Sequence, residues 1–183
     1  MNRLQNAWRP LLLGLVLLSV LVGVAGAVPT DQPSALSTRR QLMICAADFN
    51  PVNNTTAYSN NGLVLQSNVE NAHQFFMAPV EFPYSLWVTI DKVELFAYDN
   101  NNTGRIETYL YLSSPTSGSQ AGIAYLDTGF AYVDPVNDPH TWQDTTISPN
   151  VKNPANDVYV YVDISDDTSL WLYGVRIFYY MGR

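Results

Sequence analysis

Three segments of this chain have a branched aliphatic residue, or in one case threonine, at every second position and aromatic or charged residues at most of the positions between them. The segments are Ile106–Leu112, Val158–Ile164 and Val175–Phe178. The residues on the other face are Glu107, Tyr109 and Tyr111 in the first segment, Tyr159, Tyr161 and Asp163 in the second, and Arg176 and Phe178 in the third. A side-chain period of two is that of a β-strand with one buried face. The aliphatic side chains are therefore predicted to form the core, and the rings to lie on the opposite face.

Eight strands are predicted along the chain, separated by Asn, Asp, Gly and Pro. They lie around Leu63–Gln66, His73–Met77, Leu86–Tyr98, Ile106–Leu112, Ile123–Leu126, Trp142–Ile147, Val158–Ile164 and Leu170–Tyr180. No stretch keeps a helical period over three turns. Short strands with frequent turn signals are typical of sandwiches. The predicted fold is all-β, an antiparallel β-sandwich of jelly-roll type with about eight strands.

The longest predicted strand changes the parity of its aliphatic positions halfway along. The inward set begins as Leu86, Val88 and Ile90 and continues as Val93, Leu95 and Ala97. A one-residue slip would turn half of this strand away from the core. An extra residue near Asp91 and Lys92 is therefore predicted, in the form of a β-bulge.

The N-terminus has the layout of a cleavable signal peptide. Arg3 and Arg9 precede an apolar run from Leu11 to Val24, and the small residues Ala25–Ala27 follow. The alternative is a retained membrane anchor, but a bilayer-spanning helix needs about 20 apolar residues and this run is shorter. The sequence predicts a signal peptide over residues 1–27, a flexible lead-in over 28–41 and one sandwich domain over 42–183. The protein is accordingly predicted to be secreted or held at the cell surface, with no membrane span after cleavage.

The charge balance makes nucleic acid an improbable partner. The chain has 9 basic and 16 acidic residues, and removal of Arg3 and Arg9 would leave the mature domain with a net charge of −9. Proteins bind phosphate backbones through clustered Lys and Arg. The single cysteine, Cys45, cannot form an intramolecular disulfide. The domain is therefore predicted to be held together mainly by burial of apolar surface.

Several strand and turn segments resemble a loose group of exported bacterial jelly-roll domains of unassigned function. They are Ala78–Pro83, Val88–Val93, Asp99–Gly104, Tyr159–Val162 and Leu172–Ile177. The resemblance implies the sandwich fold and a bacterial envelope or extracellular setting. It carries no catalytic or ligand residues that could be transferred to this chain.

The residues needed for the common catalytic mechanisms are scarce. His73 and His140 are the only histidines, and neither lies in a nucleophile motif. Carboxylates such as Glu81, Glu94 and Glu107 could pair for glycoside hydrolysis, but spacing along the chain cannot establish the distance between them. The protein is predicted not to be an enzyme, and a glycan-active hydrolase is the alternative.

One loop places oxygen-bearing side chains at alternate positions before a glycine, as the first half of a calcium loop does. These residues are Asp99, Asn101 and Thr103, and Gly104 follows. An EF-hand is excluded because Leu110 occupies the position of the bidentate glutamate. No cofactor is predicted to be required, and a structural calcium ion is a hypothesis beside the simpler interpretation of an Asn-rich hairpin turn. Asp163, Asp166 and Asp167 form a second acidic turn with the same two interpretations.

Aromatic residues on the outward face are the strongest functional signal. Tyrosine offers a wide, flat contact area at a low entropic cost and keeps a hydroxyl for hydrogen bonding. The candidate ligand-binding residues are Tyr109, Tyr111, Tyr159, Tyr161 and Trp142, and Phe96, Tyr98, Phe178 and Tyr180 are also predicted to face outward. The alternative is that these rings are ordinary cross-strand pairs or are covered by the N-terminal segment and long loops. For Trp142, the alternative is a core position at an end of the sandwich.

The combined features predict a secreted, non-catalytic recognition module for a carbohydrate or surface polymer. The alternative is a self-associating structural subunit of a surface layer or filament, in which the same face or the last strand contacts a second copy.

Overall fold

The computed structural model describes residues 38–83, 87–129, 139–147, 150–152, 156–165 and 168–182, with the backbone alone at 150–152. The predicted signal peptide and residues 28–37 of the predicted lead-in lie outside the described residues, as do Leu86, Asp166 and Asp167. Regular structure begins at Arg40, two residues before the predicted start of the domain.

All eight predicted strands are present, and the described residues contain four more. The strands are β1 (Arg40–Cys45), β2 (Asn50–Pro51), β3 (Tyr58–Asn60), β4 (Leu65–Ser67), β5 (Gln74–Val80), β6 (Trp87–Asp99), β7 (Arg105–Ser114), β8 (Ser119–Asp127), β9 (His140–Asp144), β10 (Asn150–Lys152), β11 (Asp157–Ser165) and β12 (Leu170–Met181). The predicted number of eight was too low because β1, β2, β3 and β10 are two to six residues long. Segments of two or three residues seldom show a clear alternation, and in the longer β1 the apolar residues Leu42, Met43 and Ile44 are consecutive.

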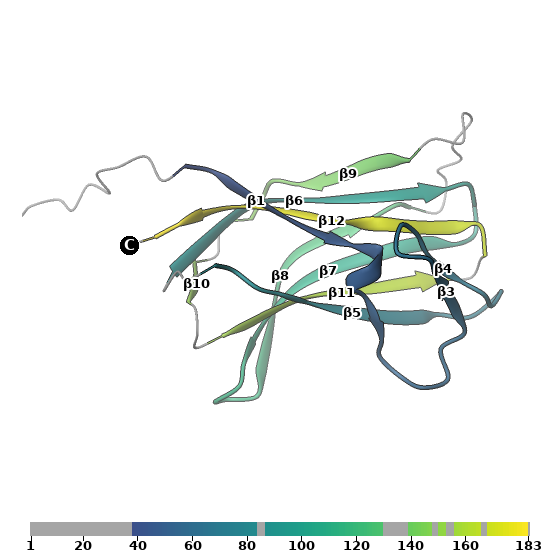
Figure 1. Ribbon diagram of the computed structural model, residues 1–183, viewed down its shortest axis with the longest axis horizontal. Helices are drawn as coiled ribbons and strands as arrows, with labels where there is room; N and C mark the ends of the chain where they lie inside the picture. The colour runs from purple at the N-terminus through teal and green to yellow at the C-terminus, as the bar shows by residue number, and fades with distance from the viewer. Residues whose placement is uncertain are drawn as a thin grey trace, which may run out of the picture. The chain divides into compact units, whose positions relative to one another are not determined.

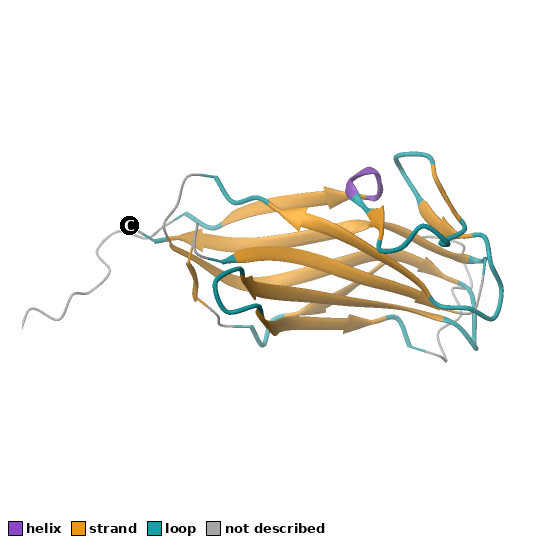
Figure 2. Ribbon diagram, turned by 90° about the horizontal axis from the view of Figure 1, so that it is seen from below, coloured by secondary structure: helices purple, strands orange, loops and turns teal. Residues whose placement is uncertain are grey.

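The strands form two antiparallel sheets that pack face to face (Figures 1 and 2). The seven-stranded sheet A has the order β10-β6-β12-β4-β3, with β1 beside β12 and β9 beside β6. The five-stranded sheet B has the order β2-β5-β11-β7-β8. This arrangement confirms the predicted antiparallel β-sandwich of jelly-roll type. The described helical structure is one 3-10 turn, Ala46–Asp48, so this part of the chain has no helix with the length and apolar character needed to cross a membrane.

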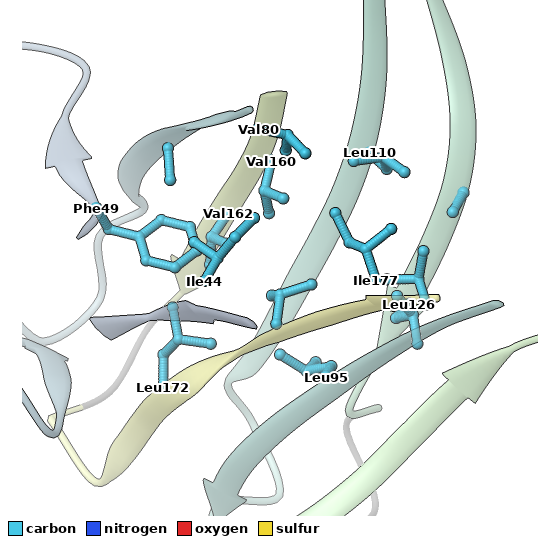
Figure 3. Packing of buried hydrophobic residues seen from close by; sticks show 14 of the residues in the cluster. Ile44, Phe49, Val80, Leu95, Leu110, Leu126, Val160, Val162, Leu172 and Ile177 are labelled. Carbon is cyan, nitrogen blue, oxygen red and sulfur yellow. The ribbon is translucent and has the colours of Figure 1, made fainter. Parts of the chain in front are cut away.

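The core lies between the sheets and is built from the aliphatic faces that the alternation predicted. Figure 3 shows Leu110 and Val160 of sheet B facing the same interior as Leu95 and Ile177 of sheet A. Each of these side chains is at most 1% exposed. Burial of one such aliphatic side chain contributes about 1.5–3 kcal/mol relative to leaving it in water. The same burial fixes the strand register, because a slip of one residue would expose a whole aliphatic row.

The predicted β-bulge in β6 is confirmed. Lys92 pairs with Phe178 whereas Ile90 pairs with Tyr179, so Asp91 is the extra residue. Ile90 and Val93 are consequently both fully buried, although they lie at positions of opposite parity.

A second bulge, which the sequence analysis did not predict, lies in β12. Leu172 pairs with Ala97 and Gly174 pairs with Phe96, so Tyr173 is the extra residue. The following Gly174 has a φ of 158°. A Cβ atom at Gly174 would lie 2.4 Å from the carbonyl oxygen of Ile44 in β1. Only glycine therefore allows β1 to pair this closely with β12.

We expect Gly174→Ala to destabilise the domain by about 2 kcal/mol or more, because β1 must move away from β12 or the backbone must distort. The measurement is the free energy of unfolding in urea, monitored by circular dichroism. The matched control is Gly122→Ala in β8, where an added Cβ would meet only Tyr111 Cε1, at 3.8 Å. Equal stability of the two variants would contradict the role assigned to Gly174.

Candidate functional site

The outer surface of sheet B carries a continuous group of aromatic side chains from four strands. Strand register creates it, because Tyr159 lies opposite Tyr111, and Tyr161 lies opposite Tyr109, which in turn lies opposite Tyr125. We call this surface the tyrosine face and define it by Phe75, Met77, Tyr109, Tyr111, Tyr125, Tyr159 and Tyr161. Its residues alternate along their strands with the buried aliphatics of the core, so the same pattern that builds the core also builds the face.

The rings of the tyrosine face contact one another across the strands. The ring centroids of Tyr111 and Tyr159 are 5.5 Å apart, and those of Tyr109 and Tyr111 are 5.7 Å apart with their planes only 15° from parallel. Tyr109 also contacts Tyr125 at 4.9 Å, and Phe75 stacks on Tyr161 at 5.7 Å. These centroid distances are those of favourable aromatic pairs. The contacts fix the ring orientations before any ligand binds, which lowers the entropic cost of binding.

The tyrosine face is accessible to solvent. Tyr125 is 44% exposed and Met77 is 43% exposed. The other four tyrosines are half-buried by their neighbours in the sheet. Exposed apolar side chains at the surface of a single domain are candidates for contact with a ligand or a partner.

A row of carboxylates borders the rings at one end of the face. Asp163, Glu107 and Asp127 lie opposite one another on β11, β7 and β8. The Tyr125 hydroxyl lies 2.7 Å from Glu107 Oε1 and 3.0 Å from Asp127 Oδ2. Burial, together with these hydrogen bonds and charges, raises the pKa of the Tyr125 phenol. Tyr125 therefore remains a hydrogen-bond donor throughout the physiological pH range.

Arg105 holds the same two carboxylates from the side. Its Nη2 lies 3.1 Å from Glu107 Oε1, and its Nη1 lies 3.1 Å from Asp127 Oδ2. The third carboxylate, Asp163, is 2.7 Å from His73 Nδ1 through its Oδ2. Burial raises the pKa of Asp163, and the hydrogen bond and charge of His73 oppose that shift. Arg105 and His73, the two basic side chains described beside the face, are thus both engaged with its carboxylates.

A pocket of about 620 Å³ adjoins the opposite end of the tyrosine face. It lies beside the C-terminal end of β5 and the start of β11. Its lining includes Met77, Pro79, Glu81, Phe82, Asp157 and Tyr159. Because Met77 and Tyr159 belong to both the pocket and the face, one ligand can contact both.

The outer surface of sheet A differs because its phenylalanines are covered by cations. The guanidinium of Arg176 lies 4.8 Å from the Phe96 ring and 5.2 Å from the Phe178 ring. Arg176 Nε donates a 2.7 Å hydrogen bond to Glu94 Oε2, and Lys92 forms an ion pair with the same carboxylate. These side chains satisfy one another, which leaves this surface less suited than the tyrosine face to binding a ligand.

The structure unites four of the five predicted ligand-binding residues and separates the fifth. Tyr109, Tyr111, Tyr159 and Tyr161 lie together, whereas Trp142 lies on β9 of sheet A and packs against the core. Tyr98 is only 6% exposed because its ring packs on Trp171, so it offers little surface to a ligand.

Sequence reasoning did not include Phe75 and Tyr125 among the candidate residues. The alternation of Tyr125 with Ala124 and Leu126 is a signal that could have revealed its outward position. Phe75 gives no such signal, because Phe76 follows it and the sequence does not show which of the two faces the core. Only the register of β5 with β11 decides between them.

The predicted calcium loop is closed by its own hydrogen bonds. Asn101 Oδ1 accepts hydrogen bonds from the backbone amides of Thr103 (2.5 Å) and Gly104 (2.8 Å) and from the Thr103 hydroxyl (2.7 Å). Asp99 is fully buried, and its carboxylate accepts hydrogen bonds from the Asn101 amide and the Thr128 hydroxyl. This geometry is that of an Asx-type turn. Calcium binding at Asp99, Asn101 and Thr103 stays a prediction.

Comparison with known proteins gives no family for this chain. No family model matches it, and no curated protein matches its sequence. Similar solved structures include a mutant of a family 29 carbohydrate-binding module, with 6% sequence identity and a TM-score of 0.42. The alignment covers 77% of this chain and 86% of the module's chain. The xylan-binding module CBM15 has 10% identity and a TM-score of 0.42, and the alignment covers 77% of this chain and 97% of the module's chain. The C-terminal domain of a chitobiase from Bacteroides fragilis has 12% identity and a TM-score of 0.44, with 78% of this chain and 100% of that domain's chain aligned. Likenesses with TM-scores below 0.5 do not establish a shared function.

The buried ion pairs of Glu94 predict a specific loss of stability in acid. Burial by itself raises the pKa of Glu94, but the hydrogen bonds and charges of Lys92 and Arg176 outweigh it and lower the pKa below its ordinary value of 4.5. The contribution of the charged carboxylate to stability is therefore complete above pH 4.5 and lost as the pH falls through the lowered pKa. We expect Glu94→Gln to destabilise the protein by about 2 kcal/mol at pH 7 and to flatten the loss of stability in acid.

Urea unfolding between pH 7 and pH 3 measures this effect, and the exposed Glu70→Gln is the control. If the free energy of unfolding falls equally steeply with pH in the wild type and in Glu94→Gln, the stabilising role assigned to the Glu94 carboxylate is contradicted.

The calcium hypothesis predicts a higher thermal unfolding midpoint in calcium chloride than in EGTA, because a ligand that binds only the folded state stabilises it. Differential scanning calorimetry measures the two midpoints. Asn101→Ala would remove both the turn and the proposed ligand, so Thr103→Val, which keeps the backbone amide, is the more informative variant. An unchanged midpoint in the wild type would rule out the calcium site and leave the hydrogen-bonded turn as the role of these residues.

Proposed function

We propose that this protein is an exported, non-catalytic recognition module that binds a polysaccharide or a related surface polymer on the tyrosine face. The observation that carries the proposal is the contact between tyrosine rings from three neighbouring strands on a solvent-accessible sheet surface. The rings form a continuous aromatic surface, and the hydroxyls of Tyr109 and Tyr125 lie at its carboxylate border. Sugar rings have apolar faces and hydroxyl rims, so the two surfaces are chemically complementary.

The spacing of the rows suits an extended polymer. Successive outward residues on one strand, such as Tyr159 and Tyr161, are two positions apart, which is about 6.7 Å along the strand. The rings therefore repeat at a regular interval along β11 and β7, as sugar units repeat along an extended polymer. The pocket beside Tyr159 continues this surface at one end, and the carboxylate row ends it at the other.

Rigid rings favour binding, because few side chains have to be ordered when a ligand arrives. Tyr109 and Tyr111 are held by their ring neighbours, and the Tyr125 hydroxyl is held by Glu107. The polar groups of the face thus position its rings and offer acceptors to sugar hydroxyls.

We expect Tyr159→Ala combined with Tyr161→Ala to weaken binding to the recognised polymer at least tenfold, about 1.4 kcal/mol, because two stacking surfaces are lost. Affinity electrophoresis against soluble xylan, mannan, β-1,3-glucan and hydroxyethyl cellulose, with pull-down on chitin and cellulose, measures retention. The matched control is Tyr180→Ala, which removes a half-buried ring from β12 of sheet A. Circular dichroism checks that both variants fold.

Unchanged retention of the double variant would exclude the tyrosine face as the binding surface. Analytical ultracentrifugation of the same samples tests the alternative function. Assembly of the wild type that the double variant abolishes, without retention by any polymer, would favour a self-associating subunit over a recognition module.

A further inference from the structure

The two sheets differ in their balance of charge, because the strands of sheet A contain as many basic as acidic residues whereas those of sheet B are mainly acidic. All four acidic residues in the strands of sheet B, namely Glu107, Asp127, Asp157 and Asp163, occupy positions that face outward with the tyrosines. Glu81 follows β5 at the next outward position and lines the pocket. Arg105 is the only Lys or Arg in these strands. Arg39, Lys92 and Arg176 instead contact the phenylalanines of sheet A.

The formal charge around the tyrosine face is therefore −4 with His73 neutral, from five carboxylates and one guanidinium. Arg105 already bonds Glu107 and Asp127, and His73 already bonds Asp163. A ligand anion on this face would have to compete with these carboxylates for each cationic group. At the pocket end, Glu81 and Asp157 are exposed, and each presents its negative charge to solvent.

We infer that the tyrosine face selects glycans that carry no carboxylate or sulfate groups, an inference that rests on the proposed function. The rings attract any sugar that presents an apolar face, so they cannot by themselves distinguish a neutral polymer from an acidic one. The carboxylates make that distinction, because like charges brought together on a partly desolvated surface repel. The repulsion acts over about 10 Å at 0.1 M salt, which is enough to reach a polymer lying on the rings.

Polymer pairs that share a backbone test this selection. The pairs are hydroxyethyl cellulose with carboxymethyl cellulose, and highly methyl-esterified homogalacturonan with its de-esterified form. Xylan, mannan and β-1,3-glucan extend the uncharged set, and alginate and chondroitin sulfate extend the acidic set. We expect the purified protein to be retarded in affinity gels by one or more uncharged polymers, and to bind the acidic polymers at least tenfold more weakly at low salt.

A charge-neutralising variant shows whether the carboxylates cause the difference. Glu81→Gln combined with Asp157→Asn removes the two exposed charges at the pocket. We expect the affinity for acidic polymers, divided by the affinity for uncharged polymers, to rise about threefold in this variant. The matched control is Glu70→Gln, which removes an exposed charge near the other end of β5. Raising the sodium chloride concentration to 0.5 M should diminish the difference between wild type and variant, since salt screens exposed charges.

Failure of this inference and failure of the proposed function give different results. Equal or stronger binding of acidic polymers would overturn the charge selection while leaving glycan recognition in place. A ratio that changes as much in Glu70→Gln as in the double variant would also overturn it, because the effect would then not come from the pocket carboxylates. Retardation by none of the polymers would contradict the proposed function and, with it, the inference.

Discussion

Burial of aliphatic side chains between two sheets is the interaction on which the rest of this structure depends. Val160 and Leu110 on one sheet and Leu95 and Ile177 on the other are almost completely removed from water. Because each strand alternates, this burial also determines what lies outside. The tyrosines reach the outer surface of sheet B because their neighbours in the chain are drawn into the core.

Continuous burial along the long strands requires local irregularities. The extra residue Asp91 in β6 restores the inward direction after Ile90, and the extra residue Tyr173 in β12 shifts the register in the opposite sense. Gly174 follows this second bulge and lets the backbone of β1 approach. The two bulges keep β6 and β12 paired over most of their length, and sheet A is built around this pair.

The two outer surfaces use aromatic residues in different ways. On sheet A, Arg176 and Lys92 lie over phenylalanine rings and share the carboxylate of Glu94, so rings and charges satisfy one another. On sheet B, the tyrosine rings contact each other, and the carboxylates gather at the ends of the face. The outer groups of sheet A are therefore paired with one another, whereas the tyrosine face of sheet B leaves aromatic surface for contact with a partner.

The sequence by itself determined the fold class, eight of the strands, the bulge near Asp91 and the outward direction of Tyr109 and Tyr159, because a period of two is a local property of the chain. Only the tertiary structure decided which strands are neighbours. Strand pairing therefore brought the tyrosines of β7, β8 and β11 onto one surface, placed Trp142 on the other sheet, and aligned Glu107 with Asp127 and Asp163. These relations join residues far apart in the chain, and the alternation within a single strand carries no information about them.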